Sequence, residues 1–237
     1  MNQLTFRQIF DGIEGILVIM ACYLTFFLRR RRSRWGLTKD DVTAVFPGDD
    51  LVVDPDVHFT HGITIQAPSS YVWPWIAQIG RGRGGFYSYE LLENITGLDI
   101  YNSDTVLKDF QQPEIGDFVE FGPNDKSPII LCEPGKYMAI ENWIDFQSQG
   151  SFDPSTYTSN SFMHLTWLWY VEPINKTSAR FYSRNRVDIT SKSKWPGLIA
   201  ALTEPIVFAM DRKMCKGIKH RAERLFAHTD NTIPPKP

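Results

Sequence analysis

Residues 67–104 read APSSYVWPWIAQIGRGRGGFYSYELLENITGLDIYNSD. The run opens on a turn at Ala67–Pro68, and apolar residues then recur at helical spacing from Tyr71 to Ile79. The glycine cluster Gly80–Gly85 breaks this helix, and a second short helix follows, with Gly97 as its stop. Short helices joined by such a break suit the mouth of a cavity. The sequence therefore predicts a pocket, but it does not name the ligand.

The glycine cluster satisfies the pattern G-x-G-x-x-G, which in dinucleotide-binding proteins cradles a pyrophosphate. That fingerprint requires a strand before the glycines and a βαβ unit around them, whereas a helix precedes them here. We interpret the glycines as a kink that permits close approach of a ligand or a neighbouring chain. His58 and His61, three apart on a predicted strand, point to opposite faces and are interpreted as structural or exposed. We predict neither a cofactor nor a metal site.

Three stretches carry a resemblance to a known family: residues 67–100 of the opening run, 116–123 (GDFVEFGP) and 210–223 (MDRKMCKGIKHRAE). The chain resembles, over residues 35–226, bacterial proteins of the START-related, birch-pollen-allergen-like superfamily, labelled SRPBCC or polyketide-cyclase-like. The resemblance implies an α+β helix-grip fold, in which a curved antiparallel β-sheet wraps around a long C-terminal helix and encloses an apolar cavity. It also implies binding of lipids, sterols or polyketides, with catalysis in only some members.

The rest of the chain independently favours an antiparallel sheet. Runs rich in β-branched and aromatic residues are separated by turn residues at regular intervals. A final helix is predicted from an N-cap at Thr203, with Pro205 in its first turn and an apolar stripe from Ile206 to Leu225. The predicted strands are Val57–Gln66, Asp117–Phe121, Ile129–Leu131, Tyr137–Trp143, Phe162–Glu172 and Ala179–Ile189.

The most aromatic strand, FMHLTWLWY at residues 162–170, supplies part of the predicted site. Its Leu165, Trp167 and Trp169 side chains share one face, which we expect to line the cavity opposite the aromatic residues that follow the glycines. The alternative is that these aromatic residues fill the core. The candidate ligand-binding residues are Trp75, Arg83, Phe86, Tyr87, Tyr89, Trp143, Trp167 and Trp169.

The amino-terminal segment predicts a transmembrane helix. Gly15–Leu28 (GILVIMACYLTFFL) is uncharged and is followed by arginines at 29–32 and 34. A bilayer core needs about 20 helical residues, so the run is short unless Ile9–Glu14 is included. The positive-inside rule places the arginines and all that follows in the cytoplasm, as a single-pass protein of the cell membrane. The alternative is an apolar helix docked on the domain.

Charge is distributed unevenly around a formal net charge of −2. Residues 36–190 carry ten Lys/Arg against twenty-one Asp/Glu, whereas both ends of the chain are basic. This acidic body argues against nucleic acid as a partner, because phosphates require a contiguous basic footprint. The predicted segments are an anchor with its basic flank (1–34), a linker (35–56), a ligand-binding domain (57–226) and a disordered tail (227–237).

Two functional classes remain. We prefer a membrane-tethered binding protein that holds a hydrophobic small molecule or lipid in an internal cavity. The alternative is a polyketide cyclase/dehydratase-like enzyme that uses a tyrosine and a carboxylate in the same cavity, and a third is a structural or regulatory protein whose cavity is filled by its own side chains. No catalytic residue is assigned, because a general acid or base must be placed in three dimensions. Isolated candidates are Tyr87, Tyr89, Asp99, Glu141 and His164.

Overall fold

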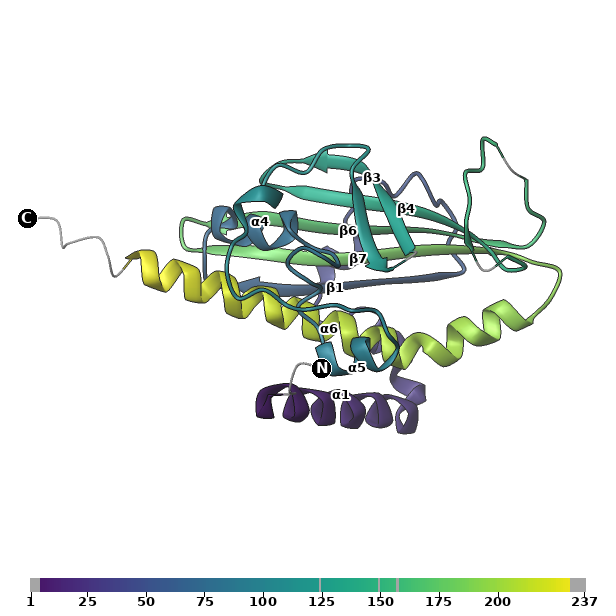
Figure 1. The fold of residues 1–237 in the computed structure, drawn as a ribbon, viewed down its shortest axis with the longest axis horizontal. Helices are drawn as coiled ribbons and strands as arrows, with labels where there is room; N and C mark the ends of the chain where they lie inside the picture. Colours follow the sequence, from purple (N-terminus) through teal and green to yellow (C-terminus); the bar gives the residue numbers. More distant parts are fainter. Residues whose placement is uncertain (1–4, 124, 149, 157, 231–237) are drawn as a thin grey trace, which may run out of the picture.

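The computed structural model describes residues 5–123, 125–148, 150–156 and 158–230. Within these residues one antiparallel sheet of seven strands packs on one face against a long C-terminal helix (Figure 1). The strands are β1 (Val57–Ile65), β2 (Phe118–Gly122), β3 (Asp125–Glu133), β4 (Tyr137–Asp145), β5 (Gly150–Ser151), β6 (Phe162–Asn175) and β7 (Ser178–Thr190). The helices are α1 (Phe6–Leu24), η1 (Phe26–Leu28), α2 (Arg29–Arg32), α3 (Lys39–Thr43), α4 (Ser69–Ala77), α5 (Glu90–Ile95), η2 (Lys108–Phe110) and α6 (Trp195–Asp230).

The strand order is β1-β7-β6-β4-β3-β2, with β5 paired to β4, and the pairings are antiparallel. The six predicted strands are confirmed, although β3 begins at Asp125, four residues before its predicted start. The long hairpin of β6 and β7 closes on a tight turn, where the Asn175 side chain accepts a hydrogen bond from the Thr177 amide at 2.8 Å. The α+β architecture, with a large antiparallel sheet and a long C-terminal helix, is consistent with a helix-grip fold.

The C-terminal helix differs from the prediction at its start. Thr203 is not an N-cap, because α6 already begins at Trp195 and contains Pro205 in its interior. The Thr203 hydroxyl donates to the carbonyl oxygen four residues earlier, at 3.0 Å, which is a contact made inside a helix rather than at its end. The helix continues to Asp230, so the predicted tail is helical over its first four residues, and residues 231–237 lie outside the described residues.

The two halves of α6 have different environments. In the C-terminal half (Asp211–Asp230), apolar side chains at helical spacing are fully buried against α4 and the sheet; they are Met214, Cys215, Ile218 and Ala222. In the N-terminal half (Trp195–Met210), several large apolar side chains are exposed; they are Trp195, Leu198, Ile199, Leu202, Ile206 and Val207. Only the C-terminal half therefore contributes a continuous face to the packed core.

The glycine cluster forms the predicted kink. The Gly80 and Gly85 main chains exchange two hydrogen bonds, of 3.1 and 3.0 Å, and both residues have positive φ angles. A Cβ atom on Gly85 would lie 2.6 Å from the Tyr101 carbonyl oxygen, so a neighbouring segment of the chain approaches the glycine closely. The interpretation of the glycines as a site of close chain approach is therefore confirmed.

Within the predicted linker, residues 35–56, the segment that contains Asp41, Phe46 and Asp49 packs on the face of the sheet opposite to α6. Asp41 and Asp49 make ion pairs of 2.7 Å with Arg180 and Arg184 of β7, and all four side chains are largely buried. Phe46 packs with outer-face residues of β4, β6 and β7. Each of these two acids therefore neutralises a largely buried arginine on the sheet.

The amino-terminal helix α1 packs against α5 and α6, on the side of α6 that faces away from the sheet (Figure 1). Gly12 and Gly15 allow this contact, because Cβ atoms there would lie 2.4 Å from Leu91 and 2.7 Å from Leu92. No single helix among the described residues combines the length and apolar composition of a membrane span; α1 with its continuation 26–32, bent by 88°, meets both criteria as a pair. The predicted transmembrane helix thus occupies the docked position of the alternative.

Candidate ligand-binding site

A cavity of about 900 Å³ lies between the N-terminal half of α6 and the sheet. It exists because only the C-terminal half of α6 packs closely, which leaves the space beneath the preceding turns open on the side of β4, β6 and β7. This volume is within the range of small-molecule sites. The apolar residues that line it are Val57, Phe59, Ile144, Phe146, Met163, Leu165, Val187, Ile189, Trp195, Pro196, Ile199, Ala200, Val207 and Phe208.

The rim of the cavity is polar and opens to the surface. Arg29 and Arg30 belong to it and are exposed, as is Trp195 at the start of α6. Glu204 also belongs to the rim, and its carboxylate pairs with Arg32 at 2.7 Å. The remaining polar lining residues include Asp56, Asp145, Gln147, Ser161, Ser191, Ser193 and Thr203.

A buried hydrogen-bond network meets the cavity at His61. The His61 Nδ1 atom contacts an Asp211 carboxylate oxygen, and the exposed fractions of these residues are 1% and 3%. The other Asp211 oxygen accepts from the Ser183 hydroxyl at 2.6 Å, and that hydroxyl accepts from Trp167 Nε1 at 2.8 Å. The Cys215 thiol is a third donor to Asp211, at 3.9 Å. These surrounding donors fix Asp211 as a hydrogen-bond acceptor.

Two polar atoms of cavity-lining residues are buried and have no hydrogen-bond partner among the described residues. They are His61 Nε2, on β1, and Asn185 Nδ2, on the adjacent strand β7. The rings of Phe59 and Phe208 surround the imidazole, with centroids 4.8 and 5.4 Å from that of His61. An unpaired polar atom in such an apolar environment is costly, so these two atoms are the ones that a ligand's polar group would satisfy.

The predicted aromatic residues form packed core instead of the walls of this cavity. The rings of Phe86 and Trp167 lie nearly parallel, with centroids 6.1 Å apart, and Trp167 contacts Trp169 at 4.8 Å. Trp75 meets Tyr87 edge-on at 6.0 Å in the same cluster. The tryptophan face of β6 does point towards the cavity side, but Leu165, two residues earlier on that face, is the residue that lines the cavity.

The other three candidates lie elsewhere. Tyr89 is buried beneath α1, where Lys213 Nζ lies 4.9 Å from its ring centroid, and burial raises the pKa of its hydroxyl. The Arg83 guanidinium lies over the Phe110 ring at 5.1 Å. Trp143 stacks on a histidine of β6 at 3.7 Å. None of the eight candidates lines the 900 Å³ cavity, and their role in ligand binding stays a prediction.

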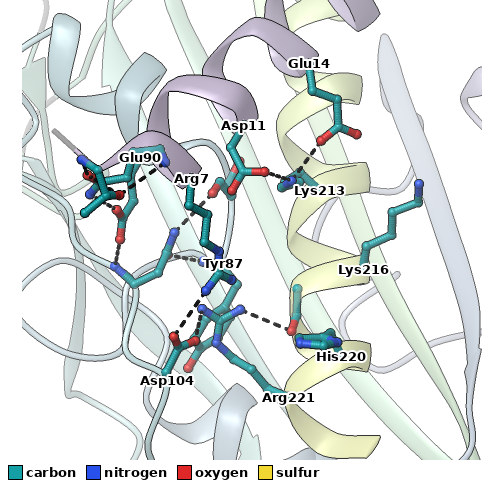
Figure 2. A pocket seen from close by; sticks show the side chains of 15 residues that line it. Arg7, Asp11, Glu14, Tyr87, Glu90, Asp104, Lys213, Lys216, His220 and Arg221 are labelled. Carbon is teal, nitrogen blue, oxygen red and sulfur yellow. Dashed lines mark hydrogen bonds and ion pairs between the residues drawn. The ribbon is translucent and has the colours of Figure 1, made fainter. Parts of the chain in front are cut away.

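A second, smaller cavity of about 310 Å³ lies where α1 meets α6, and Figure 2 shows its lining. Lys213 makes ion pairs with both Asp11 and Glu14 of α1, at 2.8 and 2.9 Å. Tyr87 belongs to this lining, and burial raises the pKa of its hydroxyl. The lining carries both signs of charge, so the cavity has no strong preference for an anion or a cation.

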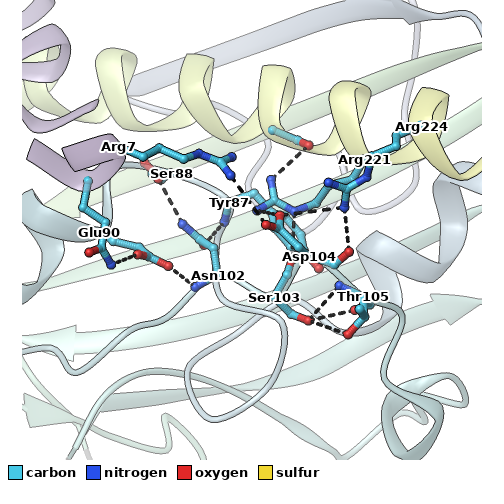
Figure 3. A network of polar contacts seen from close by, with 12 residues as sticks. Arg7, Tyr87, Ser88, Glu90, Asn102, Ser103, Asp104, Thr105, Arg221 and Arg224 are labelled. Atoms are coloured by element: carbon cyan, nitrogen blue, oxygen red, sulfur yellow. Dashed lines mark hydrogen bonds and ion pairs between the residues drawn. The ribbon is translucent and has the colours of Figure 1, made fainter. Parts of the chain in front are cut away.

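The floor of this smaller cavity is a network of polar contacts between the loop after α5 and α6 (Figure 3). Asp104 pairs with Arg221 at 2.8 Å and with Arg7 of α1 at 3.5 Å. The Arg221 guanidinium also lies 4.8 Å from the Tyr87 ring centroid, and burial lowers the pKa of this arginine. We interpret this cavity as the polar seam that holds α1 against the domain.

The residues that meet in the large cavity were not predicted from the sequence. His61 was interpreted as structural or exposed; its burial excludes the exposed alternative, and its place in the cavity lining was not predicted. One signal was present: Asp211 lies on the apolar stripe of the final helix, four residues after Val207 and three before Met214. A carboxylate on a buried helix face requires a partner, and that partner is His61.

Comparisons with known proteins concern the fold. No protein-family model matches the sequence, and no curated protein matches it. A polyketide-cyclase-like protein from Corynebacterium glutamicum is similar at 12% identity and a TM-score of 0.35, over 76% of this chain and 97% of that one. An aromatase/cyclase from Streptomyces sp. R1128 is similar at 14% identity and a TM-score of 0.28, over 71% and 94%. The di-domain ARO/CYC BexL from the BE-7585A biosynthetic pathway is similar at 16% identity and a TM-score of 0.35, over 70% and 46%. We infer the function of the cavity from residues of this chain.

Proposed function

We propose that the protein binds a hydrophobic small molecule in the 900 Å³ cavity beneath the N-terminal half of α6. The observation that carries this proposal is the cavity itself, whose lining is mainly apolar and whose rim is polar. A ligand that buries about 300 Å² of apolar surface there gains roughly 7–8 kcal/mol before the cost of its ordering. Before those costs, this gain corresponds to a dissociation constant of about 1–10 μM, so binding in this range requires a cavity that is largely preformed.

A cavity-filling substitution tests the proposal. Leu165 lines the cavity from β6, so Leu165→Trp should occupy part of its volume. We expect the affinity for the fluorescent apolar probe 1-butylpyrene to fall at least tenfold, whereas the melting temperature changes little. Ile174→Trp is the matched control, because this side chain is exposed at the far end of the same strand. Equal affinities for the parent and Leu165→Trp would remove the cavity as the binding site.

A cyclase- or dehydratase-like enzyme remains the second candidate function. The predicted tyrosines do not favour it, because Tyr87 and Tyr89 lie outside the large cavity and their raised pKa values keep both phenols protonated. The observation that favours it is the His61–Asp211 pair, since a carboxylate that orients an imidazole is a common acid–base arrangement. His61→Asn would abolish turnover of a cyclase substrate and leave its binding intact if this reading holds.

We further propose that the protein rests on a membrane surface through α1, η1, α2 and the start of α6. Exposed apolar side chains on α1, η1 and α6 support this, and the Tyr23 hydroxyl of α1 donates to the Leu202 carbonyl of α6 at 2.6 Å, which joins these two helices. Exposed arginines of α2 lie beside them and suit anionic headgroups. The apolar residues are Leu17, Met20, Leu24, Phe27, Trp195, Leu198 and Ile199. The cytoplasmic orientation predicted from the arginines stays a prediction.

Vesicle sedimentation tests the membrane proposal. We expect more protein to sediment with phosphatidylglycerol-containing vesicles than with pure phosphatidylcholine, and less after Leu24→Ser or Trp195→Ser. Ile115→Ser is the control, because Ile115 is exposed in a loop outside these elements. If all three variants sediment like the parent, the proposed surface is not the one that meets the bilayer.

A further inference from the structure

We propose that the cavity selects ligands that carry a hydroxyl group, which His61 and Asn185 bind together. This inference rests on the proposed binding function and names the chemical class of its ligand: an apolar molecule with one alcohol or phenol near the end that reaches β1 and β7. The starting observation is the pair of buried, unpartnered polar atoms in the lining, His61 Nε2 and Asn185 Nδ2.

The hydrogen-bonding character of His61 follows from Asp211. Because the Ser183 hydroxyl receives the Trp167 Nε1 hydrogen, its own hydrogen goes to Asp211, which therefore acts as an acceptor. The imidazole thus carries its hydrogen on Nδ1, facing Asp211. In the neutral ring the second nitrogen, Nε2, is then a hydrogen-bond acceptor, and it points away from the carboxylate.

The side-chain amide of Asn185 complements the His61 acceptor, because its Nδ2 atom is a hydrogen-bond donor. The register of β1 with β7 pairs Phe59 with Asn185 and His61 with Ser183. These four residues therefore share one face of the sheet, and His61 and Asn185 are diagonal neighbours across adjacent strands. An acceptor and a donor of different residues thus lie on the same stretch of the cavity lining.

A hydroxyl group matches this pair better than other neutral polar groups. It has one hydrogen to donate to His61 Nε2 and lone pairs to accept from Asn185 Nδ2. An ether can only accept, so it satisfies Asn185 and leaves His61 unpaired. A purely apolar ligand leaves both atoms unpaired. Its complex then lacks both hydrogen bonds and is less stable by the desolvation penalty of the two atoms. We therefore expect the order of affinity alcohol, then ether, then hydrocarbon.

Three fluorescent probes of nearly the same shape test this order: 1-pyrenebutanol, its methyl ether and 1-butylpyrene. We expect the parent protein to bind the alcohol about 3- to 10-fold more tightly than the ether. His61→Asn should remove this difference, because the asparagine amide can still donate to Asp211 while Nε2 is lost. Asn185→Leu should weaken the alcohol and the ether alike, and leave 1-butylpyrene within twofold of the parent.

The outcomes separate this inference from the proposed function. Binding of 1-butylpyrene without any preference for the alcohol would leave the binding function intact and overturn the hydroxyl selectivity. Failure of all three probes to bind would overturn both. If His61→Asn weakens the three probes equally, His61 has only a structural role and the inference is wrong. If that variant does not fold, the Asn185→Leu pattern alone decides, and an equal loss for all three probes contradicts the inference.

Discussion

Gly217 of α6 lies directly against the main chain of Tyr87: a Cβ atom on residue 217 would lie 2.4 Å from the Tyr87 carbonyl oxygen. Tyr87 itself has a positive φ angle of 56°, which a non-glycine residue adopts only when its surroundings hold it there. The loop after the glycine cluster and the C-terminal half of α6 are therefore in backbone contact. This contact holds the C-terminal half of α6 against the domain, whereas the N-terminal half covers the cavity.

Substitution of Gly217 tests that contact. Gly217→Ala should lower the free energy of unfolding by about 1–3 kcal/mol, because the new methyl group overpacks a site bounded by backbone. Gly197→Ala is a matched control in the same helix, since no atom of the described residues lies within 4 Å of a Cβ atom there. That control should be stabilised by up to about 1 kcal/mol through helix propensity. Urea denaturation measures the free energy of unfolding of both variants. Equal changes would show that Gly217 is not in close contact with the Tyr87 main chain.

Two glycines of the kink, Gly82 and Gly85, can be compared because their backbone angles are nearly equal. Their φ angles are 70° and 74°. In the described part of the chain, a Cβ atom at Gly82 has no neighbour within 4 Å, whereas one at Gly85 meets the Tyr101 carbonyl. Gly82→Ala should therefore cost about 1–2 kcal/mol for the left-handed backbone alone. Gly85→Ala should lower the free energy of unfolding distinctly more, because the new methyl group also collides with the Tyr101 carbonyl. If thermal unfolding ranks the two variants equally, close chain approach is not the reason for the glycine at 85.

The buried carboxyl of Glu93 should make stability depend on pH. Burial and the nearby Glu90 raise the pKa of Glu93 to about 8, whereas the unfolded chain titrates near 4.5. The folded state thus holds a proton that the unfolded state has released, so stability is complete below about pH 4.5 and falls as the pH rises towards 8. The slope is at most about 1.4 kcal/mol per pH unit.

Glu93→Gln should remove this contribution, because the amide does not ionise. We expect the variant to gain stability relative to the parent between pH 5 and pH 8, as measured by urea denaturation at both values. Glu114→Gln, at an exposed position, is the control and should follow the parent. A Glu93→Gln variant whose pH profile runs parallel to that of the parent would show that this carboxyl is ionised in the folded state.

Local patterns were sufficient to predict most of the fold. The strands were found because alternation along one strand, such as β6, is visible within a few residues, and the apolar stripe from Ile206 to Leu225 identified the C-terminal helix. The start of that helix was missed because Pro205 was placed in a first turn, although Leu198 and Leu202 continue the helical spacing before it.

The site depends on contacts between distant residues, which local patterns do not reveal. The face of β6 that bears Trp167 was identified correctly, but whether a side chain on it is core or cavity lining depends on which half of α6 lies opposite. The pairing of His61 with Asp211 joins residues 150 positions apart, so no spacing rule predicts it. The acidic residue within an apolar stripe was the one available indication.

The docking of α1 can be tested through its two glycines. A Cβ atom on Gly12 would lie 2.4 Å from Leu91, and one on Gly15 would lie 2.7 Å from Leu92. Gly12→Leu with Gly15→Leu should therefore release α1, since the ion pairs with Lys213 are partly exposed and contribute less than about 1 kcal/mol each.

Hydrogen exchange of the amides of residues 6–24 measures this release. We expect faster exchange in the double variant, because an isolated helix of this length is only marginally stable in water. Leu17→Met is the control: its side chain is exposed, and helical spacing places residue 17 away from Gly12 and Gly15, so it should leave exchange unchanged. Unchanged protection of α1 in the double variant would show that the glycine face does not hold the helix, and would favour an environment for α1 other than α5 and α6.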